Sequence, residues 1–251
     1  MRTCRGMSVA QCSLLNWTLQ CTEDRPDLST TAQRVRAALD VDSYTRGTTH
    51  SFYLYPARFH PEFARAIIEL YSSPNDVVLD PFMGGGTTIV EALALGRRAI
   101  GVDVNALGAF VAQTRTSPLS LGDELELHSW AKACTRLSRI RTESIESIAL
   151  PRNFPVSVAW LFERALEIAR KQLSFPRQLR FARCALLRLG QVCFDGRYEL
   201  PTADAVLGRL PELVDQLLRG LREFVTECQE AGVLKHQIRK RRLLLARGAE
   251  G

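Results

Sequence analysis

The sequence of 251 residues lacks the features that mark several large classes of protein. It has no run of about 18 apolar residues, which argues against a membrane span, and its N-terminus lacks the apolar core of a secretory signal. We find no internal repeat and no low-complexity stretch. The composition, 46% hydrophobic and 24% charged, is typical of a globular protein rather than a disordered or fibrous one.

Paired cysteines are also missing. The chain has seven cysteines, an odd number, and no C-x-x-C motif, so the sequence suggests neither a disulfide framework nor a zinc site. Reduced thiols fit best, and most of the cysteines fall in segments with a helical pattern, where we expect them to be buried. We therefore expect a cytoplasmic protein without a bound metal.

Positive charge is concentrated at the end of the chain. Of the formal net charge of +6, the segment 235–251 carries +5 and the rest of the chain carries only +1. A local basic cluster is typical of a nucleic-acid contact, but it is also typical of a solvated helix end. Both interpretations stay open at this point.

The first half of the sequence predicts a short α/β unit. Hydrophobic spacing predicts helices over 31–39 and from Pro61 onward, and a structured loop rich in aromatic residues lies between them. A short apolar strand follows at 77–80, then a Gly-rich turn, a helix over 87–95 that ends at Gly96, and a second strand at 99–104. This order predicts one right-handed βαβ unit with parallel strands.

The second half is mostly helical in pattern. Apolar residues recur at helical spacing between positions 123 and 230, with breaks at 151–155, 174–176 and 195–201. The apolar segment 242–247 is a candidate third strand. We divide the chain into an N-terminal extension (1–43), a βαβ core (44–121), a helical region (122–234) and a basic tail that leads into the candidate strand (235–251).

The glycine turn is the most informative feature. Gly84, Gly85 and Gly86 directly follow the first strand and precede a helix, so a ligand is able to approach the backbone and the positive end of the helix dipole. Asp103, at the end of the second strand, follows Gly86 at close to the spacing of an acid that binds ribose hydroxyls. The pattern predicts a ligand that contains a nucleoside.

The residues around the turn narrow the choice of ligand. Ile89 stands where a G-x-G-x-x-G motif needs its last glycine, and no lysine follows the glycines, which argues against NAD, FAD and a P-loop. Asp80 is placed to bind an ammonium group. S-adenosylmethionine, which has both an amine and a carboxylate at this end, fits the pattern. A glycine turn that only packs the strand on the helix is the simpler alternative.

Three segments resemble the amino-group DNA methyltransferases, which modify N4 of cytosine or N6 of adenine. The segment YPARFHP (55–61) resembles the part of that family that closes over the methionine end of the cofactor. DPFMGGGTT (80–88) is similar to the family's D-P-F-x-G-x-G-T-T loop, and GVDVN (101–105) to its ribose-binding strand end. The resemblance is strong from His50 to Ser120 and looser over the helical region.

The resemblance implies a Rossmann-like S-adenosylmethionine-dependent methyltransferase fold with a large helical C-terminal region. It implies that Asp80 and the glycines contact the methionine moiety, that Arg58 and Phe59 line it, and that Asp103 binds the ribose; Phe82 either shapes the pocket or packs in the core. The implied cofactor-binding residues are Arg58, Phe59, Asp80, Phe82, Gly84, Gly85, Gly86, Thr87, Thr88 and Asp103.

The catalytic motif of that family is absent. Its members activate the amine with Asp, Asn or Ser followed by Pro-Pro and an aromatic residue, but this chain has 11 prolines and no Pro-Pro pair. The family has a seven-stranded sheet, whereas this sequence predicts two strands and a candidate third. We therefore expect an incomplete sheet and the cofactor-binding part of a methyltransferase, and we assign no catalytic residue.

The resemblance implies an enzyme of DNA methylation, as in restriction-modification, with double-stranded DNA as its partner. The missing motif leaves two explanations open: a truncated product, or one part of a split enzyme in which a second polypeptide carries the motif. We expect Arg239, Lys240, Arg241 and Arg242 to contact the nucleic acid. A non-catalytic nucleic-acid-binding or protein-binding remnant is one alternative, and an RNA methyltransferase is another.

Overall fold

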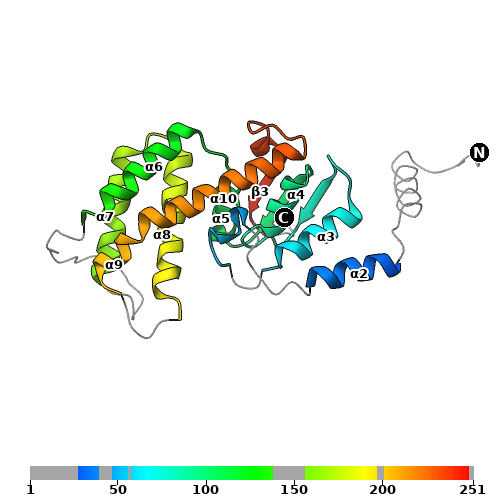
Figure 1. Ribbon diagram of the computed structural model, residues 1–251, viewed down its shortest axis with the longest axis horizontal. Helices are drawn as coiled ribbons and strands as arrows, with labels where there is room; N and C mark the ends of the chain where they lie inside the picture. The colour runs from blue at the N-terminus through cyan, green and yellow to red at the C-terminus, as the bar shows by residue number, and fades with distance from the viewer. Residues whose placement is uncertain (1–27, 40–46, 56–57, 138–155, 197–200, 249–251) are drawn as a thin grey trace, which may run out of the picture.

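The computed structural model describes residues 28–39, 47–55, 58–137, 156–196 and 201–248. Within them the chain forms a mixed α/β structure with a small sheet and a large helical part. Figure 1 shows the sheet with α2 to α5 on one side of the molecule and α6 to α9 on the other. No described helix is both long and apolar enough to cross a membrane.

The sheet has three parallel strands in the order β1-β2-β3, namely β1 (Val77–Asp80), β2 (Arg98–Asp103) and β3 (Arg242–Ala246). In the register, Leu79 pairs with Ile100 and Ile100 with Leu243. The predicted parallel βαβ unit and the strand over 77–80 are confirmed. The second strand begins and ends one residue earlier than expected, because Arg98 still pairs with Val77.

Four helices and a 3-10 turn surround the sheet region: α2 (Leu28–Leu39), η1 (Thr48–Ser51), α3 (Pro61–Tyr71), α4 (Thr87–Ala94) and α5 (Ala106–Arg115). Helix α3 begins at Pro61 as expected, and the ring Nδ1 of His60 accepts a hydrogen bond from the backbone N–H of Glu62 at its N-cap. The first helix begins three residues earlier than predicted, and α4 ends one residue earlier, before the left-handed Gly96.

The helical part contains α6 (Leu121–Cys134), α7 (Val156–Gln172), α8 (Pro176–Phe194), α9 (Ala203–Gly208) and α10 (Leu210–Glu230), and the 3-10 turn η3 (Ile238–Arg241) leads into β3. The predicted break at 174–176 separates α7 from α8. The break expected at 151–155 and part of that at 195–201 lie outside the described residues. The apolar face of α10 forms part of the hydrophobic core, where Leu217 and Phe224 are fully buried.

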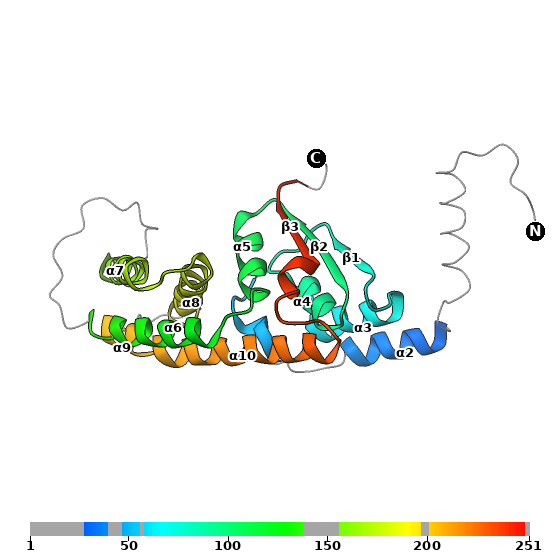
Figure 2. The ribbon, with the colours of Figure 1, turned by 90° about the horizontal axis from the view of Figure 1, so that it is seen from above.

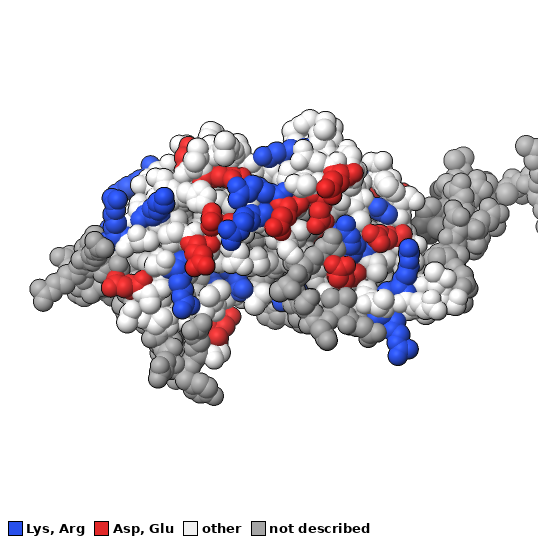
Figure 3. Space-filling view, in the orientation of Figure 1, with Lys and Arg blue, Asp and Glu red and all other residues white. Residues whose placement is uncertain are grey.

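Helix α10 joins the two parts. It packs against α6, α8 and α9 of the helical part and also against η1 and α4 beside the sheet. Figure 2 shows it running beneath both parts for most of the length of the molecule. On its outer face acidic and basic side chains are intermixed (Figure 3). One hydrophobic core therefore continues from the sheet into the helices.

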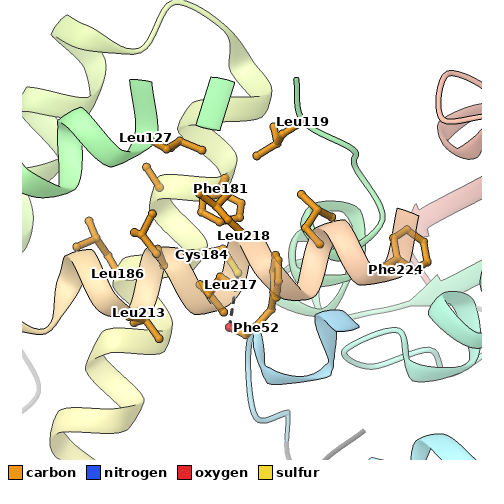
Figure 4. Close-up of a cluster of buried hydrophobic side chains, with 14 of the residues drawn as sticks. Phe52, Leu119, Leu127, Phe181, Cys184, Leu186, Leu213, Leu217, Leu218 and Phe224 are labelled. Carbon is orange, nitrogen blue, oxygen red and sulfur yellow. Dashed lines mark hydrogen bonds between the residues drawn. The ribbon is translucent and has the colours of Figure 1, made fainter. Parts of the chain in front are cut away.

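The buried thiols belong to this core. The cysteines at positions 134, 184, 193 and 228 are buried thiols, as expected, whereas those at 4, 12 and 21 lie outside the described residues. Burial raises the pKa of Cys184 to about 12. The Cys184 thiol donates a weak hydrogen bond to the backbone oxygen of Phe52, which inserts among α8 and α10 (Figure 4).

One face of the sheet is exposed and apolar. Val77, Leu79 and Leu243 lie on this face and are 51%, 61% and 51% exposed. Among the described residues no strand pairs with the outer edge of β1. Parallel sheets normally have both faces covered, so this surface differs from that of a closed α/β protein.

Candidate functional site

The turn between β1 and α4 lies at the carboxyl end of the parallel strands. Gly84 and Gly86 have φ angles of 49° and 79°, a left-handed conformation that favours glycine. A Cβ atom on Gly86 would lie 2.6 Å from the Cβ of Ala112 in α5. Glycine therefore suits Gly84 and Gly86 because of their left-handed backbone, and it suits Gly86 also because the turn packs closely on α5 there.

Two backbone groups of the turn, one on Gly84 and one on Gly85, are held by polar side chains. The Gly84 N–H donates to Asp103 Oδ2 at 2.8 Å, and the Gly85 carbonyl accepts from Arg115 Nη1 at 2.5 Å. The other carboxylate oxygen of Asp103 accepts from the Asn105 N–H at 2.7 Å. Each carboxylate oxygen has a second lone pair, so Asp103 keeps the capacity to accept hydrogen bonds from a ligand.

An aromatic side chain covers the turn. Cβ atoms built on Gly84 and Gly85 would lie 3.2 and 2.9 Å from atoms of Tyr55. The segment before Tyr55 is fixed to α8, because the backbone N–H and carbonyl of Leu54 both bond to the Gln191 side chain, at 2.9 and 3.0 Å. The helical part therefore holds the aromatic segment in place over the glycines.

A chain of buried polar groups runs behind the turn. Arg115 Nη2 bonds to His50 Nδ1, and His50 Nε2 lies 2.7 Å from Glu91 Oε1. The second carboxylate oxygen of Glu91 accepts from Arg65 at 2.9 Å, and Arg65 also donates to Glu227 of α10 at 3.1 Å. His50, Glu91 and Arg115 are 7%, 1% and 2% exposed, so these interactions are shielded from water.

A cavity of about 450 Å³ opens beside the turn. Its lining combines Gly85 and Thr87 of the turn and α4 with Arg58, and with Arg188 and Arg219 of the helical part. Burial, and next the nearby Arg58 cation, lower the pKa of Arg188. The residue before α4 is a glycine and supplies no side-chain cap, which leaves the positive helix end available to a ligand. The cavity suits an anionic group.

The structure brings only some of the predicted cofactor residues into this cavity. Arg58, Gly85 and Thr87 line it, and Thr88 follows in the first turn of α4. Asp103 and Gly84 lie next to it in the turn region. Asp80 accepts a hydrogen bond from the backbone N–H of the residue two positions later, at 3.1 Å.

The two predicted aromatic residues are exposed. Phe82 is 82% exposed, which excludes it from the core, and Phe59 is 59% exposed with its ring 5.6 Å from that of Phe63. Neither lines the cavity. Their roles at the cofactor stay predictions.

The basic residues near the end of the chain fall into two groups. Arg241 donates to the Gly96 carbonyl at 2.7 Å and to Asn75 at 2.6 Å, and Arg242 donates to Ser117 Oγ at 3.0 Å and to two carbonyls near the end of α5. Burial lowers the pKa of Arg242 to about 10. Arg239 and Lys240 are exposed. Contact with nucleic acid remains a prediction, and the exposed pair is better placed for it.

Sequence reasoning did not find Arg115, Glu91 or Arg65, and it assigned His50 only a position in a loop. The available signal was a glutamate within the apolar α4 segment and an arginine at the end of α5. Such patterns do not show which charged side chains pair with each other in the folded chain. Among the described residues no group of three His, Cys, Asp or Glu side chains is placed to hold a metal.

Comparisons with known proteins find similarity in the part of the chain that contains the turn. Residues 18–107 match a family of N6/N4 methyltransferases described as DNA methylase. The chain is 35% identical over 82 residues to Type II methyltransferase M.MvaI of Kocuria varians. The aligned segment covers 32% of this chain and 18% of the relative. The predicted resemblance to the amino-group DNA methyltransferases is confirmed for this part of the chain.

Two further relatives match in shorter segments. Type II methyltransferase M1.MboII of Moraxella bovis is 60% identical over 40 residues, 16% of this chain and 15% of the relative. DNA adenine methyltransferase YhdJ of Escherichia coli is 40% identical over 52 residues, 21% of this chain and 18% of the relative. The matches span less than a fifth of the length of these three relatives. No solved structure matches significantly.

The packing of Gly86 makes a testable prediction. Gly86→Ala adds a strained φ and an overlap with Ala112, so we expect it to lower the free energy of unfolding by about 3 kcal/mol, measured by urea denaturation. Gly232→Ala is the matched control, since Gly232 has a φ of 81° and nothing within 4 Å of an added Cβ. That control should lose only about 1 kcal/mol. Equal losses in the two variants would contradict close packing of the turn on α5.

Proposed function

We propose that the chain binds S-adenosylmethionine at the glycine turn, as the cofactor-binding part of a DNA methyltransferase with a Rossmann-like fold. The observation that carries the proposal is the combination of the turn, the arginine-lined cavity and Asp103 at the carboxyl ends of β1 and β2. This edge of a parallel sheet is where ligands bind in α/β proteins.

The residues present fit the chemical groups of that cofactor. The cavity at the start of α4, lined by Arg58, Gly85 and Thr87, suits the carboxylate of the methionine moiety. The Asp80 carboxylate, on the same edge, suits its ammonium group. Asp103 has lone pairs left for the ribose hydroxyls, and the exposed ring of Phe82 is free to pack on the ligand.

The reaction that we propose is methyl transfer to an exocyclic amine of DNA, N4 of cytosine or N6 of adenine. When bound, the cofactor would supply an electrophilic methyl group: the amine nitrogen would bond to the methyl carbon while the bond from that carbon to the sulfonium sulfur breaks, S-adenosylhomocysteine would leave, and the amine proton would pass to water or to a base outside this chain. This chain contributes the binding and orientation of the cofactor. We assign the activation of the amine to a Pro-Pro-aromatic motif outside this chain.

The second polypeptide that carries this motif is expected to pack on the sheet. Among the described residues no strand pairs with the outer edge of β1, so its backbone groups are available to a partner strand. The apolar side chains of Val77 and Leu79 lie on this strand, and that of Leu243 lies on the same face of the sheet in β3. A partner that adds a parallel strand beside β1 would place its own residues at the same edge of the sheet as Asp80 and Asp103. The motif would then lie near the cofactor.

Cofactor binding is tested by isothermal titration calorimetry of the full chain with S-adenosylmethionine. We expect saturable binding and at least a roughly tenfold higher Kd for Asp103→Ala, which removes charge-assisted hydrogen bonds. Asp204→Ala, at an exposed position in α9, is the control and should leave Kd unchanged. No binding at millimolar ligand would overturn the proposal.

The partner is tested by transfer of a tritiated methyl group to duplex DNA. We expect no transfer by this chain alone, and transfer when a polypeptide that carries the Pro-Pro-aromatic motif is added. Leu79→Lys should abolish this reconstitution without changing cofactor affinity, whereas Leu125→Lys, at a 62% exposed position on α6, should have no effect. Methylation by the chain alone would contradict the proposed division of roles.

Contact with DNA is tested by the salt dependence of binding. We expect Arg239→Ala and Lys240→Ala each to lower the slope of log K against log salt by about one, because each removes a phosphate contact. Their unfolding free energies should stay within about 0.5 kcal/mol of the parent. Lys171→Ala, exposed on α7, is the control. An unchanged slope in both tail variants would exclude them from the DNA contact.

A further inference from the structure

Arg115 is an unusual residue to find behind a turn of glycines. It is the last residue of α5, and its side chain is only 2% exposed. Burial lowers the pKa of its guanidinium to about 10, and its Nε has no hydrogen-bond partner in the part of the chain that the structure describes. Burial of a cation is costly, so the interactions that this side chain makes need an explanation.

Arg115 connects the turn to a histidine. One of its terminal nitrogens donates to the Gly85 carbonyl at 2.5 Å, and the other donates to Nδ1 of His50. Arginine has donors only, so Nδ1 of His50 is the acceptor and the proton of the neutral ring is on Nε2. That proton is then donated to Glu91 at 2.7 Å, which fixes the tautomer and the orientation of the ring.

Glu91 links this series of hydrogen bonds to helix α10 through Arg65. The carboxylate, 1% exposed in the middle of α4, also accepts from Arg65 of α3 at 2.9 Å. Arg65 lies 3.1 Å from Glu227 of α10. The groups therefore form a continuous series from α10 through α3, α4 and η1 to the Gly85 carbonyl.

The two hydrogen bonds at the turn act on the backbone of adjacent residues, Gly84 and Gly85. Asp103 holds the N–H of Gly84 at 2.8 Å, and Arg115 holds the carbonyl of Gly85. Both side chains come from the segment that begins in β2 and ends in α5. Glycine has more backbone freedom than any other residue, so a turn of three glycines depends on external contacts to keep one conformation.

We propose that Arg115 is a positioning residue of the cofactor site: held by His50 and Glu91, it fixes the Gly85 carbonyl and keeps the glycine turn in the conformation that binds the cofactor. This inference rests on the proposed binding of S-adenosylmethionine. An apolar side chain of similar size would fill the space, but it would leave the Gly85 carbonyl and His50 Nδ1 without this donor. Arg115 also lines the cavity beside the turn, next to the Gly85 carbonyl that it holds.

The test compares two arginines with the same substitution. Arg115→Met removes the donor at the turn. Arg177→Met removes a comparable donor in the helical part, where Arg177 Nε lies 2.7 Å from Oδ2 of Asp123, a carboxylate that is only 1% exposed. Both variants should unfold at lower urea concentration. Only Arg115→Met should raise the Kd for S-adenosylmethionine, by roughly tenfold or more, and Arg115→Lys should recover part of the affinity because it restores a charged donor.

Hydrogen exchange of the Gly84–Thr88 amides separates this inference from the proposed function. We expect faster exchange there in Arg115→Met than in the parent or in Arg177→Met, with no ligand added. If the parent does not bind S-adenosylmethionine, the proposed function fails and the exchange result decides whether Arg115 holds the turn. A cofactor affinity in Arg115→Met within twofold of the parent, or unchanged exchange at the turn, would overturn the inference.

Discussion

The arrangement of the site depends on how the glycine turn is held. Three glycines in succession give the backbone little preference of its own, and two of them adopt left-handed φ angles. The hydrogen bond that Gly84 donates to Asp103, the one that Arg115 donates to the Gly85 carbonyl, and the contacts of Tyr55 and Ala112 leave one conformation. The start of α4, the cavity and the carboxyl end of the sheet take their positions relative to this turn.

The helical part contributes directly to the site. Helices α8 and α10 supply Arg188 and Arg219 to the cavity, and Gln191 holds the segment that places Tyr55 over the glycines. Glu227 of α10, which is partly exposed, ends the series of polar groups behind the turn. A change in the position of α10 would therefore reach the turn through ion pairs as well as through packing.

The sequence was enough to predict the local structure around the turn. A strand, a glycine turn, a helix and a second strand in close succession have few structural solutions, so the βαβ unit was predicted with errors of a residue at its ends. The third strand was found because it is a short apolar segment. The tail was harder, since a run of basic residues does not distinguish Arg241 and Arg242, which bond to backbone carbonyls, from the exposed Arg239 and Lys240.

Contacts between distant segments were beyond sequence reasoning. The pairing of Arg115 with His50 joins residues 65 positions apart, and that of Arg65 with Glu227 joins residues 162 positions apart. Spacing rules describe neighbours within one helix or strand and carry no information on such pairs. The cavity escaped prediction for the same reason, because segments far apart in the sequence line it.

A structure of the chain with bound S-adenosylmethionine would show whether the glycine turn is the cofactor site. We expect the methionine carboxylate in the cavity beside Gly85, Thr87 and Arg58, the ribose hydroxyls bonded to Asp103, and the Gly85 carbonyl still bonded to Arg115. A cofactor bound elsewhere on the molecule, or a turn that releases both Asp103 and Arg115 when it binds, would contradict this expectation.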